Sequence, residues 1–181
     1  MALKMLGIEY SEPIELTALG NRFYKLTKPH SVNFVFKDLK LDKIYIIRAK
    51  YLAGFITNFR SGSPLVDFFI DQIGNQAMQE LYLFHDAAYT PNSLVDGEPK
   101  HLVSKSKADE ILRAGIVFAL DRNPKRWKWA NRAKARIVKL AVTLFGGSAY
   151  RDNDAVTDKN SYLFTITSEP VIINKKLFVM P

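Results

Sequence analysis

A histidine, an aspartate and a tyrosine stand within one short run, Leu83-Phe-His-Asp-Ala-Ala-Tyr89, whose apolar spacing is helical. On a helix, His85 and Tyr89 share a face because they are four residues apart. A carboxylate that holds one imidazole nitrogen leaves the other able to take a proton from water. Asp109, on the next expected helix, is the candidate carboxylate. The pattern therefore favours general-base chemistry, with His85 as the base.

Asp86 is a second carboxylate, free in this arrangement for a hard cation. Calcium takes oxygen ligands from carboxylates and loop carbonyls, so calcium is the expected ion. The other histidines, His30 and His101, are expected in surface loops, and three histidines at these separations form no zinc motif. The sequence has no Walker loop, dinucleotide fingerprint or G-x-S-x-G elbow, which disfavours the enzyme classes that depend on them.

The same residues have structural interpretations. His85 and Asp86 could belong to a buried polar network that fastens their helix to Thr57-Asn58, since buried polar groups are usually fully hydrogen-bonded. Asp109 lies three residues after Ser106, almost the spacing of a capping box. Its carboxylate could then stabilise the start of its own helix. The residue types alone leave catalysis and architecture both open.

Two consecutive helices must position these side chains. Apolar periodicity predicts helices over 75–89 and 106–121, which we expect to pair antiparallel, and a shorter helix over 64–73. Asn123-Pro124 predicts the start of a further helix, which we expect to stop at Gly146-Gly147. The expected buried positions of the two pairing helices are Ala77, Met78, Leu81, Phe84, Ala88, Ala108, Ile111, Leu112, Ile116 and Ala119.

Short runs rich in aromatic and β-branched residues predict strands on either side of these helices. Residues 13–50 are interpreted as β, with strands over 13–17, 22–27, 32–36 and 43–47, and a loop is expected over 90–104. The fold class is α+β: a small antiparallel sheet packed on three to four helices. Residues 1–150 are interpreted as one domain and 151–181 as a C-terminal β extension, which returns to the sheet or pairs with a partner.

The composition is that of a basic globular chain. It has 181 residues, a formal net charge of +8 and no cysteine, so disulfides and thiolate metal sites are excluded and a reducing compartment is expected. No apolar run reaches the length of a membrane span. The charge favours an anionic partner, although charge also serves solubility alone.

Much of the positive charge lies in the expected helix 124–145, which contains no acid. A basic helix with aromatic flanks suits nucleic-acid phosphates, anionic lipid or an acidic protein, and a solvated helix face is the plain alternative. We expect Trp129 to be exposed. The expected buried stripe comprises Trp127, Ala130, Ile137, Val138, Ala141 and Leu144.

The run His85-Asp86-x-x-Tyr89 with a distant Asp109 resembles the site of the secreted phospholipase A family that cleaves the sn-2 ester, and of the parvovirus capsid phospholipase domain. The resemblance implies His85 as general base, Asp86 as calcium ligand, Tyr89 as a hydrogen-bonding support and Asp109 as the residue that orients His85. This chain lacks the family's Y-x-G-x-G calcium loop and its disulfides, and the turn Ser61-Gly62-Ser63 is a weak substitute.

A wider resemblance, over roughly Phe23 to Tyr150, is to a family of unknown function common in tailed bacteriophages and prophages. That family's pattern is G-F-x-T-D-F-A-S, H-D-x-x-Y, A-D and an aromatic-G-G-x-x-x-Y close. The corresponding blocks here begin at Gly54, at Leu83, at Lys107 and at Val142. Asn58 stands where the family usually has aspartate, so it could offer an amide oxygen to calcium but supplies no charge and no base.

The resemblance implies a bacteriophage accessory or structural protein that is made in the host cytoplasm and attached to the virion at the tail or neck. Other virion proteins would then be its partners, in a homo- or hetero-oligomeric assembly. Two other functions remain open: a calcium-dependent phospholipase-like or other envelope hydrolase, and a nucleic-acid-binding protein that uses helix 124–145.

Overall fold

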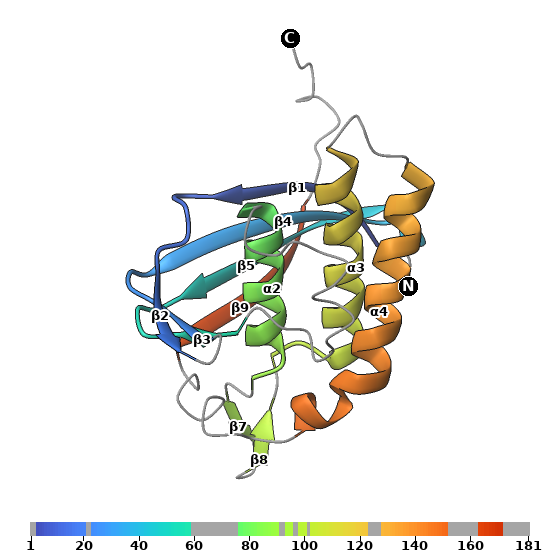
Figure 1. Ribbon diagram of the computed structural model, residues 1–181. Coiled ribbons are helices and arrows are strands. Elements are labelled where there is room, and N and C mark those ends of the chain that lie inside the picture. Colours follow the sequence, from blue (N-terminus) through green and yellow to red (C-terminus); the bar gives the residue numbers. More distant parts are fainter. Residues whose placement is uncertain are drawn as a thin grey trace.

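The chain folds into a layer of helices packed on one face of an antiparallel sheet (Figure 1). The computed structural model describes residues 3–20, 23–58, 76–90, 93–95, 98–100, 102–122, 128–151 and 163–171. Its strands are β1 (Leu3–Tyr10), β2 (Leu16–Gly20), β3 (Phe23–Leu26), β4 (His30–Asp38), β5 (Lys43–Tyr51), β6 (Ile56–Thr57), β7 (Ser93–Val95), β8 (Glu98–Lys100) and β9 (Phe164–Val171). Its helices are α2 (Gln76–Ala88), α3 (Lys105–Asp121) and α4 (Lys128–Arg151).

The main sheet has the strand order β1-β4-β5-β9, and every neighbouring pair in it is antiparallel. Along β4 the side chains alternate between buried and half-buried, as expected for a strand with one face on the core. The buried set faces the helices, and the Phe34 ring meets the Phe84 ring of α2 edge-on at 5.3 Å. The core therefore lies between this sheet and the helix layer.

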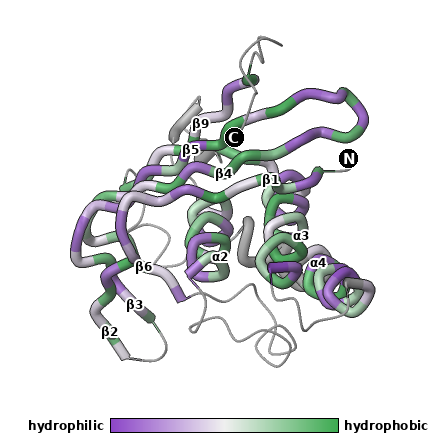
Figure 2. The backbone as a smooth tube through the Cα atoms, turned by 90° about the horizontal axis from the view of Figure 1, so that it is seen from above, coloured by the Kyte–Doolittle hydropathy of each residue, from purple (hydrophilic) through white to green (hydrophobic). Residues whose placement is uncertain are grey.

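In that layer α3 lies between α2 and α4, and α4 lies beyond the β1 edge of the sheet (Figure 2). Almost all of α2 is buried, so it is a central helix and not one with a single apolar stripe. Gly115 of α3 packs directly on Leu81 of α2: a Cβ at Gly115 would lie 2.1 Å from Leu81 Cδ2. The missing side chain allows the two helices to approach closely enough for their polar residues to meet.

A smaller sheet brings the chain back to α2. Its order is β2-β3-β6, and the short strand β6 ends at Thr57, whose side chain contacts Asp86 of α2. The hairpin of β7 and β8 lies between α2 and α3 in the sequence. Our expectation of a loop over 90–104 is therefore wrong at the hairpin.

The α+β class is confirmed, as are the expected buried positions of α2 and α3. The helix predicted over 64–73 lies outside the described residues. Two other predictions are corrected. Residues 3–10 form an edge strand that the sequence interpretation omitted, and α4 continues through Gly146-Gly147 to Arg151. Strand β9, from the segment assigned as an extension, pairs with β5 inside the main sheet.

Candidate functional site

The predicted histidine–aspartate pair is formed between α2 and α3. His85 Nε2 lies 3.2 Å from Asp109 Oδ1, and the Tyr89 hydroxyl donates to the same oxygen at 2.6 Å. The His85 and Tyr89 rings pack together with their centroids 4.1 Å apart. Only about 2% of the His85 and Asp109 side chains is exposed. The spacing of His85 and Tyr89 on one helical turn is what lets both reach one carboxylate.

The second carboxylate oxygen of Asp109, Oδ2, also has two hydrogen-bond partners. Lys105 Nζ lies 2.9 Å from Oδ2, and the Thr143 hydroxyl of α4 donates to it at 3.3 Å. One carboxylate thus receives hydrogen bonds from all three described helices. The capping alternative for Asp109 is wrong, because α3 begins at Lys105 after Ser104 and the Asp109 side chain bonds elsewhere. Lys105 and Thr143 were not anticipated, although Lys105 lies one helical turn before Asp109.

These contacts set the charge states of the pair. Burial is the largest influence on Asp109 and would raise its pKa, but hydrogen bonds from His85, Tyr89 and Lys105 outweigh it and lower the pKa to about 2. For His85, burial is again the largest influence and lowers the pKa, with Asp109 opposing it in part. The pair is therefore a neutral imidazole beside a carboxylate at neutral pH.

Asp86, the expected calcium ligand, fastens α2 to the end of β6. Its Oδ2 accepts a hydrogen bond from the Thr57 hydroxyl at 2.5 Å and another from the Asn58 backbone N–H at 3.3 Å. The second of these hydrogen bonds is made by the Asn58 backbone N–H, whereas the calcium hypothesis calls on the Asn58 side-chain oxygen. Calcium needs roughly six to eight oxygen ligands. Among the described residues, however, no group of three or more acidic or histidine side chains could hold a metal ion. Asp86 and Asn58 alone do not fit calcium, and its binding stays a prediction.

A second buried histidine–carboxylate pair lies on the other side of α2. His30, at the start of β4, contacts Glu80 through Nε2 at 2.8 Å, and Gln76 donates to Glu80 at 2.6 Å. The Tyr51 ring stacks on His30. Our assignment of His30 to a surface loop is wrong, whereas His101 lies outside the described residues. The alternation His30, Val32, Phe34 would have placed this histidine on the buried face of a strand.

A third buried carboxylate, Glu110, joins the edge strand to the helices. It accepts hydrogen bonds from the Leu3 N–H, from Arg113 and from Lys139 of α4. Burial, the largest influence, would raise the Glu110 pKa, but these donors lower it to about 2. Asp109, Glu80 and Glu110 therefore each have partners on more than one secondary-structure element.

The surface of α4 that points away from the core has an unusual composition. Trp129, Ile137 and Leu140 are 65%, 42% and 59% exposed, and Arg132 and Arg136 are exposed beside them. We call these residues, with the exposed Ala133, the α4 outer face. The exposure of Trp129 and the burial of Val138 and Ala141 are as predicted, and Ala135 is buried beside them. The prediction that Ile137 is buried is wrong, and Ala130 is only half-buried. The side chains of Trp127 and Leu144 lie outside what the structure describes.

No family model, curated protein or solved structure matches the chain. The phage resemblance therefore rests on its four motif blocks. Among the helices that the structure describes, none is both long enough and apolar enough to cross a membrane.

Proposed function

We propose that this chain is an accessory protein that works by attachment, and that it attaches through the α4 outer face. The supporting observation is that three large apolar side chains occupy the side of α4 turned away from the core, where a helix normally presents polar residues. They are interleaved with arginines, and α4 contains no acidic residue. Exposed apolar groups gathered in this way are typical of an interaction surface.

An anionic bilayer surface is the partner that this face fits best. Tryptophan is favoured at the membrane interface, aliphatic side chains enter the acyl boundary, and arginines pair with lipid phosphates. Burying Ile137 and Leu140 would each contribute up to about 1.5–3 kcal/mol, and each cation about 1 kcal/mol near an anionic surface. A nucleic-acid backbone would use the arginines but leave Ile137 and Leu140 in water, so it is the weaker candidate.

In this proposal the His85–Asp109 network is architecture. Asp109 is bonded by His85 of α2, Lys105 of α3 and Thr143 of α4. Asp86 of α2 accepts hydrogen bonds from Thr57 and Asn58. Satisfied buried networks of this type specify how elements pack. The network supports a rigid platform for α4. A virion location at the tail or neck, with other virion proteins as partners in an oligomeric assembly, is proposed from the motif resemblance alone.

Vesicle flotation tests the attachment. Wild-type protein should float with vesicles of phosphatidylcholine mixed with phosphatidylglycerol, and much less with phosphatidylcholine alone. Leu140→Gln should weaken the flotation, because it removes apolar area from the contact. Leu19→Gln is the matched control, since Leu19 is 48% exposed on β2, which is not part of this face. Equal flotation of the two variants, or tighter binding to duplex DNA than to anionic vesicles, would contradict the proposal.

A hydrolase is the second candidate, and a specific observation supports it. His85 and Tyr89 both contact the Asp109 carboxylate, which is the set of partners that the phospholipase resemblance implies. Here His85 would take a proton from water, and Asp109 would orient the ring and stabilise its charged form. The test is fatty-acid release from the same anionic vesicles, with calcium and with chelator. Release that His85→Asn abolishes, in a variant that stays folded, would establish the enzyme and overturn the purely architectural role.

A further inference from the structure

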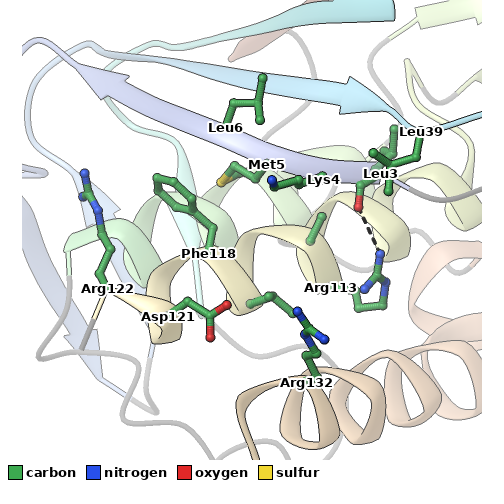
Figure 3. Close-up of a pocket in the computed structure, with 12 residues that line it drawn as sticks. Leu3, Lys4, Met5, Leu6, Leu39, Arg113, Phe118, Asp121, Arg122 and Arg132 are labelled. Carbon is green, nitrogen blue, oxygen red and sulfur yellow. Dashed lines mark hydrogen bonds between the residues drawn. The ribbon is translucent and has the colours of Figure 1, made fainter. Parts of the chain in front are cut away.

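A groove runs between the edge strand β1, helix α3 and the first turns of α4. Its volume is about 700 Å³, within the range of small-molecule sites. Figure 3 shows Phe118 beneath Met5 of β1, with Arg132 reaching in from α4. Val117 and Phe118 on α3 are half-buried, which leaves part of each accessible to a ligand. The groove therefore has an apolar floor that the fold does not fill.

Basic side chains surround this floor. Lys4, Arg122 and Arg132 are all exposed at the groove, and within the described part of the chain no carboxylate pairs with any of them. The Arg122 guanidinium lies over the Phe118 ring, 4.9 Å from its centre. The one acid of the lining, Asp121, already accepts a hydrogen bond from Asn131 at 2.8 Å. Asp121 keeps its negative charge, but Lys4, Arg122 and Arg132 outweigh it, so the net charge at the groove is positive.

At the end of this groove, side chains of α3 form hydrogen bonds with the backbone of β1. The Leu3 N–H donates to Glu110, and Arg113 donates to the Leu3 carbonyl at 3.2 Å, as the dashed line in Figure 3 marks. A partner strand that added to β1 would have to displace both side chains at Leu3. A ligand that needs no backbone pairing would leave these contacts intact. This disfavours an extended peptide as the occupant.

We propose that this groove binds a long-chain anion, with its alkyl chain on Val117 and Phe118 and its carboxylate or phosphate headgroup between Arg122 and Arg132. Apolar contact supplies affinity, and arginine provides donors suited to either headgroup. Arg132 belongs both to this groove and to the α4 outer face, whereas Leu140 belongs to the α4 outer face alone. Leu140→Gln, which should weaken vesicle flotation, should leave binding in the groove unchanged.

Calorimetric titration with four probes tests the ligand class. Dodecanoate and dodecyl phosphate, each below its micelle-forming concentration, should bind, and their relative affinities distinguish a fatty acid from a phosphate headgroup. Dodecyltrimethylammonium, which has the same chain and the opposite charge, should bind much more weakly. Acetate, which has the charge and no chain, should not bind. Equal binding of the cationic probe, or tighter binding of polyglutamate than of dodecanoate, would overturn the proposal.

Two variants locate the headgroup. Arg122→Gln and Arg132→Gln should each lower dodecanoate affinity about three- to tenfold, the range expected when a partly exposed ionic contact is lost. Arg136→Gln is the matched control, since Arg136 is exposed one turn along the same helix and does not line the groove. Unchanged affinity in both groove variants would refute the assignment.

Methyl-labelled methionine gives a readout that does not depend on any substitution. Met5 lines the groove, whereas Met78 is buried in α2 and is absent from the lining. Dodecanoate should shift the Met5 methyl resonance and leave that of Met78 unchanged. A titration that moves neither resonance would place any observed binding elsewhere on the protein and overturn the site.

Discussion

Tyr89, the residue after α2, donates a hydrogen bond of 2.6 Å to Asp109 of α3, whereas the buried Tyr51 hydroxyl has no hydrogen-bond partner among the described residues. Tyr89→Phe should lower the free energy of unfolding by about 1.5–3 kcal/mol, the usual contribution of a hydrogen bond to a charged group. Urea unfolding at neutral pH measures this change in the free energy of unfolding. Tyr51→Phe is the control and should be neutral or stabilising, since it removes a buried hydroxyl that makes no bond. Equal losses in the two variants would show that the bond to Asp109 contributes no specific stability.

Acid should destabilise this protein in two stages. The His85 pKa is lowered by burial, so the unfolded chain binds a proton first and stability begins to fall below about pH 6.5. The pKa values of Asp109 and Glu110 are lowered to about 2, so the stability that they contribute is complete above about pH 4–5 and is lost as pH falls towards 2. Each of these carboxylates should contribute roughly 2–3 kcal/mol.

Urea midpoints measured from neutral pH down to about 3 test this order. Asp109→Asn and Glu110→Gln should each flatten the acid limb of the curve while lowering stability at neutral pH. If the urea midpoint of the wild-type protein does not change between neutral pH and about pH 3, these buried groups have ordinary pKa values and the prediction is wrong.

Gly115→Ala should destabilise the protein even though alanine favours helix. Helix propensity alone predicts a gain of roughly 1 kcal/mol. The new Cβ, however, would lie 2.1 Å from Leu81 Cδ2, and Leu81 is fully buried. Overpacking of this kind costs about 1–3 kcal/mol or more. Thermal unfolding shows whether the substitution lowers or raises the stability of the protein. A raised unfolding midpoint would show that α2 and α3 separate easily at this contact.

The helix pair was predictable because its signals are local. The four-residue spacing of His85 and Tyr89, and the apolar periodicity of both helices, place these side chains without any knowledge of the sheet. The contact of Asp86 with Thr57 and Asn58 was also anticipated as one alternative. Lys105 and Thr143 were not, because their contacts with Asp109 depend on how α3 and α4 pack.

The errors have physical causes. Gly146-Gly147 resembles a helix stop, but α4 continues through it, so the local preference of glycine did not decide the boundary. Edge strand β1 was omitted, and it pairs with β4 about thirty residues later, a contact that no local pattern reveals. Ile137 was assigned to the core by residue type, whereas the described side chains of α4 that are buried are Asn131, Ala135, Val138 and Ala141.

The most direct test of the attachment proposal is the emission of Trp129 on anionic vesicles. A Trp127→Phe variant leaves Trp129 as the only tryptophan, since the chain has two. The proposal predicts that its emission shifts to the blue on phosphatidylglycerol-containing vesicles and is quenched by lipids brominated on their acyl chains. Emission that stays at the wavelength of a hydrated indole while the protein is bound to those vesicles would show that the α4 outer face is not the contact surface.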